Sequence, residues 1–160
     1  MIYTTKNENI GIDGKNYKVA IIVSEWHLDV GERLLNGAVE TLKKYNVKDE
    51  NITIIKVPGS VEITPAAKWL AETNKYDAII CLGCVIQGET KHFDYVCQSV
   101  THGITELNLR YNIPFVFGVL TTYNKQQAFE RAGGKFGNKG SECAETALIM
   151  ISLKKRILNS

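Results

Sequence analysis

Four short apolar runs, each followed by a segment of helical character, constrain the fold of this chain more than any other feature of its sequence. The runs cover residues 17–23, 51–57, 76–82 and 114–120, and they are rich in branched and aromatic side chains. Unbroken apolar character is typical of strands that are buried on both faces of a parallel sheet. Parallel neighbours need crossovers of a dozen or more residues, which helices usually supply.

The segments between the runs have the apolar spacing of amphipathic helices. A first helix is predicted from Asp29, which is placed to cap it, to about Tyr45, and a second begins at Glu62. The remaining segments are a helix over 95–109, a short segment over 124–131, a glycine-rich link over 133–140 and a closing helix over 141–158. The sequence therefore predicts an α/β fold, a three-layer αβα sandwich of the flavodoxin-like type with a four-stranded parallel sheet.

The length of 160 residues fits one domain with one core. We predict an N-terminal arm over residues 1–15, which could add an edge strand to a neighbouring subunit, and a single domain over residues 16–160. A net charge of +2 gives no reason to expect a nucleic-acid partner. The sequence has no apolar run near the roughly 20 residues that span a bilayer and no signal-peptide pattern, so we expect a cytoplasmic protein without a membrane partner.

The four cysteines include a C-x-x-C pair, Cys81 and Cys84, besides Cys97 and Cys143. Redox pairs of this kind lie at a helix N-terminus, whereas Cys81 falls at the end of a predicted strand. Zinc would need two more ligands at suitable spacing, and no Asp or Glu spacing indicates another metal cage. We therefore expect reduced thiols and no metal site.

Each predicted strand ends in residues that are unusual for a plain connection. They are Trp26 and His27, then 59–62, then 88–92, then Thr121 and Thr122. The carboxyl ends of parallel strands share one edge of the sheet, and open α/β sheets bind ligands there. The sequence thus predicts one pocket that is lined by four loops.

The loop after the third run resembles a phosphate-binding loop without being one. Residues 83–90 spell G-x-x-x-x-G-E-T, in which Glu89 replaces the lysine that would meet the phosphates of a nucleotide. A carboxylate at that place repels phosphates, so we reject a nucleotide triphosphatase. Gly88 and Thr90 could still offer hydrogen-bond donors to a single phosphate.

Two further features indicate acid/base chemistry and anion binding. His92 follows the loop, and an imidazole can take and give a proton near neutral pH, although it could equally be a local cap at the helix start. Arg131, Lys135 and Lys139 lie in or beside the glycine-rich link, which could bind an anion or be a solvated turn. A neighbouring subunit could bring these cations to the pocket.

Four segments together form a pattern that is more specific than any single loop. They are VPGSVEI (57–63), GCVIQGETKHFDYV (83–96), FGVLTT (117–122) and RAGGKFGNKG (131–140). In this order, over roughly residues 17–157, they resemble the lumazine synthases of riboflavin biosynthesis. The resemblance implies a transferase-type enzyme that condenses 5-amino-6-(ribitylamino)uracil with 3,4-dihydroxy-2-butanone 4-phosphate. The products would be 6,7-dimethyl-8-ribityllumazine, phosphate and water, and no cofactor is expected.

The resemblance also implies roles for single residues. His92 would be the general acid/base, and Trp26 would stack on the pyrimidine ring. The ring and its ribityl chain would be contacted by Ser60, Val61, Glu62, Cys84, Val85 and Ile86. The phosphate would be held by Gly88, Glu89, Thr90 and Arg131. An adjacent subunit would supply Phe117, Lys139 and Arg131, with Glu142 near enough to pair with a basic partner.

The chain departs from the usual family residues at three places. Trp26-His27 stands for Phe-Asn, Gln87 for Arg and Glu89 for Ala. A tryptophan can still stack on a ring. Glu89, however, must point away from a bound phosphate or weaken that half of the site.

A homopentamer with sites between its subunits is a further implication of the resemblance. Some members close twelve pentamers into a sixty-subunit icosahedral shell. Residues 133–140 lack the insertion that is frequent in members that stop at pentamers, so a shell is allowed, and riboflavin synthase is a candidate partner. Two alternatives stay open: a non-catalytic protein that binds flavin or lumazine, and a shell-forming protein with a decayed site.

Overall fold

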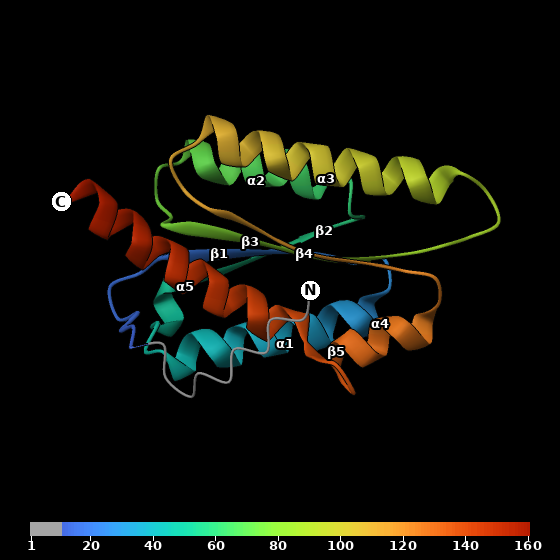
Figure 1. Cartoon of the computed structure of the whole chain (residues 1–160), viewed down its shortest axis with the longest axis horizontal. Coiled ribbons are helices and arrows are strands. Elements are labelled where there is room, and N and C mark those ends of the chain that lie inside the picture. The colour runs from blue at the N-terminus through green and yellow to red at the C-terminus, as the bar shows by residue number, and fades with distance from the viewer. Residues whose placement is uncertain (1–10) are drawn as a thin grey trace.

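A parallel sheet of four strands in the order β2-β1-β3-β4 forms the centre of the computed structural model, which describes residues 11–160 (Figure 1). The element bounds in chain order are β1 Val19–Ser24, α1 Leu28–Lys44, η1 Asp49–Asn51, β2 Ile52–Val57, α2 Ile63–Glu72, β3 Ala78–Ile86, α3 His92–Arg110, β4 Phe115–Thr122, α4 Lys125–Arg131, β5 Ala132–Gly134, β6 Gly137–Asn138 and α5 Lys139–Leu158. From β1 the chain first adds β2 on one side, and it then crosses to add β3 and β4 on the other side. The direction of the strand order therefore reverses between β1 and β3. Such a switch point opens a crevice at the carboxyl ends of the strands.

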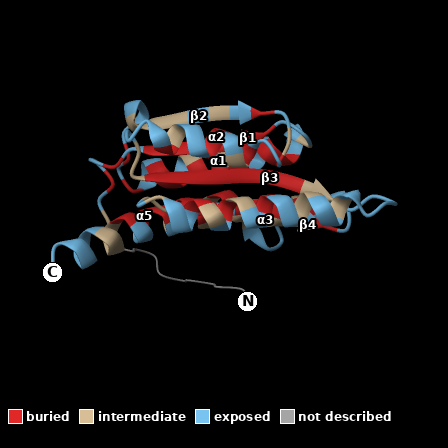
Figure 2. Cartoon of the chain, turned by 90° about the horizontal axis from the view of Figure 1, so that it is seen from above, coloured by how far each residue is buried: buried red, intermediate tan, exposed pale blue. Residues whose placement is uncertain are grey.

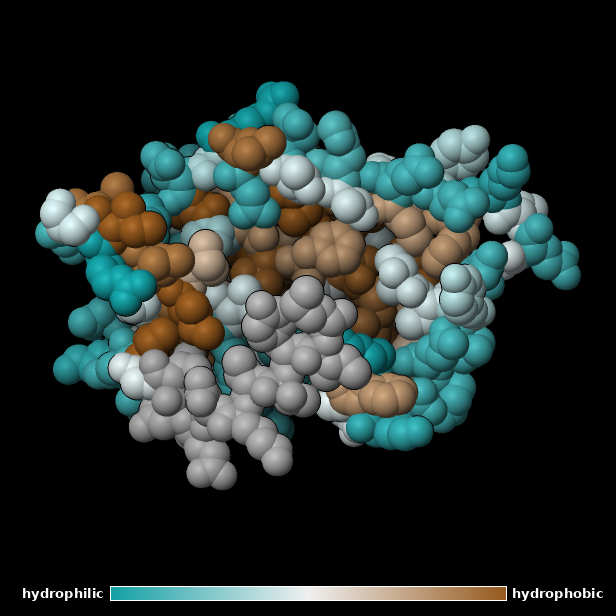
Figure 3. All heavy atoms as spheres, viewed as in Figure 1, coloured by the Kyte–Doolittle hydropathy of each residue, from teal (hydrophilic) through white to brown (hydrophobic). Residues whose placement is uncertain are grey.

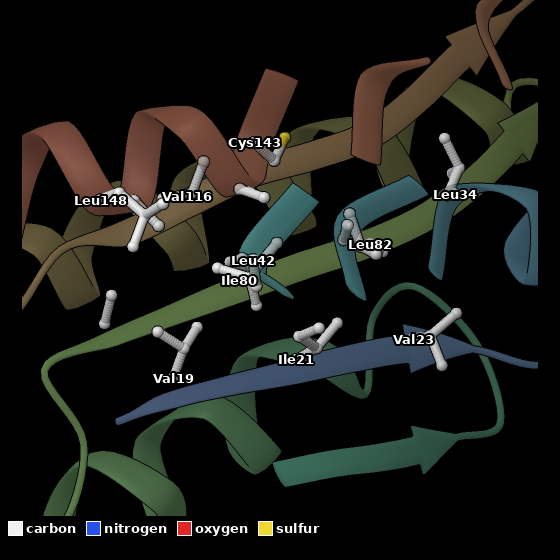
Figure 4. Packing of buried hydrophobic residues seen from close by; sticks show 14 of the residues in the cluster. Val19, Ile21, Val23, Leu34, Leu42, Ile80, Leu82, Val116, Cys143 and Leu148 are labelled. Carbon is white, nitrogen blue, oxygen red and sulfur yellow. The ribbon is translucent and has the colours of Figure 1, made fainter. Parts of the chain in front are cut away.

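Helices cover both faces of the sheet, which confirms the predicted three-layer architecture. The helices α2 and α3 lie on one face, and α1, α4 and α5 lie on the other (Figure 1). Because side chains alternate along a strand, β1 feeds both layers: Ile21 packs toward α1 and α5, and Ile22 packs toward α2 and α3. Figure 4 shows the first of these layers, with Leu42 of α1 and Leu148 of α5 near Ile80 of β3.

The two central strands are buried along almost their whole length, as their unbroken apolar runs predicted (Figure 2). Every residue of β1 is buried, and it pairs with β2 on one side and β3 on the other. The strand β2 lies at an edge, where Ile54 is 44% exposed. This arrangement fixes the loop after β1 next to the loops after β2 and β3.

The strand β3 extends further than predicted. The sequence indicated an end at Leu82, but β3 continues to Ile86 because β4 pairs with it over the whole distance, from Ile79 opposite Phe115 to Ile86 opposite Thr122. Gly83, which was predicted to begin a loop, is therefore a strand residue. The same pairing places Thr121 and Thr122 in β4 and not in a loop. A phosphate loop would need this backbone to curl around an anion, so the extended course also excludes that interpretation of 83–90.

The predicted cap of α1 is wrong. The helix begins at Leu28, and its N-cap is His27 in the left-handed conformation, with φ 60° and ψ 53°. Asp29 lies in the first turn, where its Oδ1 accepts from the Val30 N–H at 3.0 Å and its Oδ2 pairs with Lys125 Nζ at 2.6 Å. Both partners of this ion pair are about half exposed, so it contributes at most about 1 kcal/mol.

Two other predicted boundaries also move. The helix α3 begins at His92, three residues before the predicted start at Tyr95, and α5 begins at Lys139, two residues before Ser141. The glycine-rich link is not an irregular loop: it contains the short β5–β6 hairpin, whose Gly133 and Gly137 have φ values of 96° and 82°. Residues with a Cβ adopt this region reluctantly, so glycine is needed at both positions.

The predicted N-terminal arm lies mostly outside the described residues. The last residues of the arm are described. In them, the Gly14 N–H donates to the Tyr45 carbonyl at 2.7 Å, and Ile12 packs against the core that includes α1. Within residues 11–160, no helix combines the length and the apolar character needed to cross a membrane.

Candidate active site

A pocket of about 480 Å³ opens at the carboxyl edge of the sheet, at the switch point between β1 and β3. Its lining comes from the loops after β1, β2 and β3 and from the first turn of α3. The lining residues are Trp26, His27, Gly59, Ser60, Val61, Glu62, Cys84, Val85, Ile86, Gly88, Thr90, His92, Phe93 and Val96. Three of the four predicted strand-end segments therefore meet, and the fourth, Thr121 and Thr122, does not line the pocket.

The loop after β1 contributes an aromatic side chain and an imidazole. The Trp26 side chain is 71% exposed. The backbone N–H of Trp26 donates to the Pro58 carbonyl at 3.1 Å, and this hydrogen bond joins the loop to the one after β2. Burial lowers the pKa of His27, and the nearby positive charge of Lys125 lowers it further, against the opposing effect of Asp29. The imidazole of His27 is therefore neutral at pH 7 and can both donate and accept a hydrogen bond.

The loop after β2 brings polar groups to the opposite wall. The hydroxyl oxygen of Ser60 is buried, while Val61 and Glu62 are exposed at the pocket. Glu62 is also the N-cap of α2, and its Oε2 would lie 2.9 Å from a β-carbon at Gly59. A side chain at position 59 would push this flexible carboxylate away from the loop.

The end of β3 and the start of α3 form the rest of the wall. Cys84, Val85 and Ile86 are strand residues, and the ladder continues one step beyond them, because the Gln87 N–H donates to the Thr122 carbonyl at 2.9 Å. His92 is the first residue of α3, and its backbone N–H donates to Thr90 Oγ1 at 3.4 Å. The side chain of the N-cap residue, Lys91, makes no cap hydrogen bond, and the positive end of the helix dipole faces the loop that contains Gly88 and Thr90.

A second group of predicted residues lies apart from the pocket, around Glu142 at the start of α5. Glu142 Oε2 is 2.9 Å from Lys139 Nζ and 3.7 Å from Arg131 Nη2, and Arg131 Nη1 donates to the Phe136 carbonyl at 3.3 Å. The shorter distance makes Lys139 the main partner of Glu142. Two cations facing one carboxylate leave a net positive charge, which suits an anion.

The structure thus brings together the predicted residues of the ring site and of part of the phosphate site, and it leaves others elsewhere. Arg131, Lys139, Glu142, Phe117 and Glu89 are not among the lining residues. Glu89 is exposed and lies outside the lining. Phe117 lies on the edge strand β4 and is 37% exposed.

Sequence reasoning missed two lining residues, Phe93 and Val96. Both had a usable signal, because Phe93 follows His92 directly and Val96 lies one helical turn after it, on the same face. His27 and Gly59 were predicted at the strand ends and do line the pocket, although the sequence assigned neither of them a role. The left-handed backbone at His27 had no signal in the sequence.

Three of the four cysteines, Cys81, Cys84 and Cys143, are buried like apolar residues, and Cys97 is half-buried. Cys81 packs on the α2/α3 face and Cys84 on the α1/α5 face of the same strand, so the two sulfurs of the C-x-x-C point to opposite sides. Burial raises the pKa of Cys84 to about 11 and that of Cys143 to about 12, and it also raises the pKa of Cys81. In the described part of the chain, all four thiols are free, and no group of three His, Cys, Asp or Glu side chains could hold a metal ion.

Known proteins resemble this chain over nearly its whole described length. The family model of 6,7-dimethyl-8-ribityllumazine synthase matches residues 16–155. The chain belongs to this family. Among curated relatives named 6,7-dimethyl-8-ribityllumazine synthase, that of Parabacteroides distasonis is 56% identical over 88% of both chains. That of Cytophaga hutchinsonii is 56% identical over 82% of this chain and 83% of its own, and that of Coxiella burnetii is 49% identical over 89% and 94%.

Membership of the lumazine synthase family confirms the resemblance that the four segments indicated. The matched range contains all four segments and every residue of the pocket. It also contains Arg131, Lys139 and Glu142, which form the separate group at the start of α5.

Proposed function

We propose that this chain condenses 5-amino-6-(ribitylamino)uracil with 3,4-dihydroxy-2-butanone 4-phosphate to 6,7-dimethyl-8-ribityllumazine, releasing phosphate and water. The observation that carries the proposal is the position of His92, which begins α3 at the wall of a pocket that also holds Trp26, in a chain of the lumazine synthase family. The pocket combines an aromatic face, apolar walls and one exposed imidazole. A ring substrate and repeated proton transfers need these three features.

The pyrimidine ring is assigned to the part of the pocket beside Trp26. The exposed indole offers a flat apolar face, and stacking of a ring on it removes both surfaces from water. Val85 and Ile86 form an apolar wall, while Ser60 and Glu62 offer hydrogen-bonding groups to the ring edge and the ribityl hydroxyls. Cys84 and Val61 complete this lining.

The phosphate is assigned to the loop of Gly88 and Thr90 at the N-terminus of α3. A β-carbon at Gly88 would meet no atom within 4 Å, so a ligand can approach this backbone closely. The helix dipole and the Thr90 hydroxyl favour an anion there. Among the described residues that line the pocket there is neither lysine nor arginine, so the matching cation must come from elsewhere. We assign this role to Arg131 of a neighbouring subunit, whose guanidinium is held by Glu142 and by the Phe136 carbonyl.

His92 is assigned the proton transfers. The 5-amino group of the uracil attacks the ketone, and the resulting hydroxyl leaves as water once it receives a proton. A proton then leaves the carbon next to the imine as phosphate departs from the following carbon, and the enol formed becomes a ketone. The ribitylamino nitrogen attacks that ketone, and a second water leaves. An imidazole can donate in the dehydrations and accept in the elimination.

A homopentamer is the assembly we propose, with each site built from two subunits. The face along β4 carries exposed apolar side chains, namely Phe117, Met150, Ile157 and Leu158. Figure 3 views this face, and apolar side chains form a band across its middle between more polar surfaces. Contiguous apolar surface of this kind marks an interface between proteins. Such an interface would bring Phe117 and Arg131 of one subunit toward the pocket of the next, and pentamers could close into a shell.

Lumazine formation by the purified protein tests the proposed function. With both substrates present, product absorbance should rise faster than in the spontaneous condensation, and His92→Ala should slow the catalysed rate by roughly 10²- to 10⁴-fold. The same substitution at His102, an exposed residue of α3 outside the pocket, is the matched control. A wild-type rate equal to the spontaneous one would refute the enzyme and favour a protein that only binds lumazine or flavin.

A further inference from the structure

Two buried serine hydroxyls lie close together at the pocket, and one of them, that of Ser24, has no role in the site described so far. Ser24 is 0% exposed and Ser60 is 6% exposed, and their Oγ atoms are the buried side-chain polar atoms without a hydrogen-bond partner among residues 11–160. Burying a hydroxyl without a partner opposes folding, so native structures rarely retain one. A hydrogen bond between the two hydroxyls, or from one of them to a bound ligand, would supply the missing partners.

Both hydroxyls face the same glycine. Ser24 ends β1 next to Gly83 of β3, since the neighbouring residues Val23 and Leu82 are paired, and Ser60 follows β2. A β-carbon at Gly83 would lie 2.8 Å from each of the two Oγ atoms, so only glycine leaves this space open. The two oxygens are thus separated by at most twice that distance. Rotation about χ1 of either serine changes the distance between the two Oγ atoms.

The two serines differ in their access to the pocket. Ser60 lines it, whereas Ser24 does not and lies behind the lining. The Ser60 hydroxyl oxygen is buried, so rotation about χ1 must turn it toward a ligand in the pocket, and the ligand can then interact with Ser24 only through Ser60. This order fixes which of the two hydroxyls meets the substrate.

We propose that Ser24 is a positioning residue for the pyrimidine substrate: its hydroxyl donates to Ser60 Oγ, and the Ser60 hydroxyl then donates to a carbonyl oxygen of the uracil ring. The direction follows from the number of donors, since each hydroxyl has one proton. If Ser60 donated to Ser24 instead, the Ser24 proton would be left buried without an acceptor. The chosen direction satisfies both protons, and each bond polarises the next. The inference rests on the proposed function, because it takes its ring from that reaction.

Ser24→Ala, Ser60→Ala and the double variant test this relay. KM for the pyrimidine substrate and its calorimetric Kd should each rise roughly 2- to 10-fold in Ser24→Ala, the effect of one neutral hydrogen bond, while kcat and KM for the phosphate substrate stay unchanged. The double variant should bind no more weakly than Ser60→Ala alone, because Ser24 acts only through Ser60. Thr41→Val is the matched control: it removes a buried hydroxyl of α1 outside the pocket, and it should leave both constants unchanged.

A stability measurement separates the relay from a structural role. The unliganded Ser24→Ala variant should unfold at the wild-type temperature or above it, since it loses a hydroxyl that has no partner in the free protein. A lower unfolding temperature, unchanged KM and Kd, or additive effects in the double variant would each overturn the relay. The relay would also be overturned if the wild-type protein did not bind the pyrimidine substrate. Calorimetric binding of that substrate needs no turnover, so it can test the relay even if the proposed reaction fails.

Discussion

The pocket contains two imidazoles, those of His92 and His27, and different backbone features position them. His92 begins a long helix, and its place in the 83–96 segment could be predicted from the sequence because a strand, a glycine loop and a helix succeed one another there. His27 depends on a backbone in the left-handed region, which no periodicity reveals. The positive charge of Lys125 in α4 also acts on His27. Lys125 is far from His27 along the chain, so the sequence did not indicate this interaction.

The lowered pKa of His27 predicts a pH dependence of stability that His27→Asn should remove. Between the lowered folded pKa and the usual value of 6.5, the unfolded chain binds more protons than the folded one, so the free energy of unfolding falls as pH falls through this window. Asparagine tolerates the left-handed conformation and does not titrate. Thermal unfolding from pH 8 to pH 5 should therefore show the wild type losing more stability below pH 6.5 than the variant.

The same asparagine substitution at His102, which is exposed on α3, controls for the loss of a histidine as such. Asp29, the carboxylate that acts on His27, is present in both proteins, so the difference between the curves isolates the imidazole. Parallel curves for wild type and His27→Asn over the whole range would contradict the prediction.

At the scale of elements, the strands and helices were predictable but some of their ends were not. Apolar runs and helical spacing are local properties, and they located every strand of the central sheet. The end of β3 was missed because Gly83 suggested a loop, whereas pairing with β4 keeps the chain extended to Ile86. The starts of α3 and α5 were missed by two or three residues for a similar reason: polar residues in a first turn do not show the apolar spacing that identifies a helix.

The course of β3 also determines which thiols can react. Because Cys81 and Cys84 point into opposite core layers and Cys143 is buried in α5, we expect at most one thiol per native chain, Cys97, to react with a thiol reagent at pH 8. The buried thiols have raised pKa values, about 11 for Cys84, so almost none of their thiolate exists at that pH. Titration with a chromogenic disulfide should give no more than one thiol in the native protein and four after denaturation.

Fast reaction of two thiols in the native protein would mean that β3 opens readily. Loss of two thiols together, with a disulfide between Cys81 and Cys84, would contradict the opposite orientation of the two side chains. Cys97→Ser is the control, and it should abolish the native reaction while leaving the other three thiols protected.

At the scale of the whole molecule, one chain contains both halves of the proposed site but does not join them. The described lining of the pocket includes His92 but neither lysine nor arginine, and the group around Glu142 has two cations that lie outside this lining. The sequence could predict the residues of each half from their motifs. It could not decide from one chain whether the halves meet, because that depends on how subunits pack against the face along β4.

Subunit mixing decides whether the two halves come from different chains. His92→Ala and Arg131→Ala, each impaired alone, should form hybrid pentamers when they are refolded together in equal amounts. If His92 and Arg131 of a site belong to neighbouring subunits, roughly a quarter of the sites receive both intact residues, so about a quarter of the wild-type rate should return at a low concentration of the phosphate substrate. If one chain supplies both, no site is repaired and the rate stays at the average of the two variants. Wild type refolded with the double variant is the matched control, because shared sites then keep roughly a quarter of the full rate and unshared sites keep roughly half.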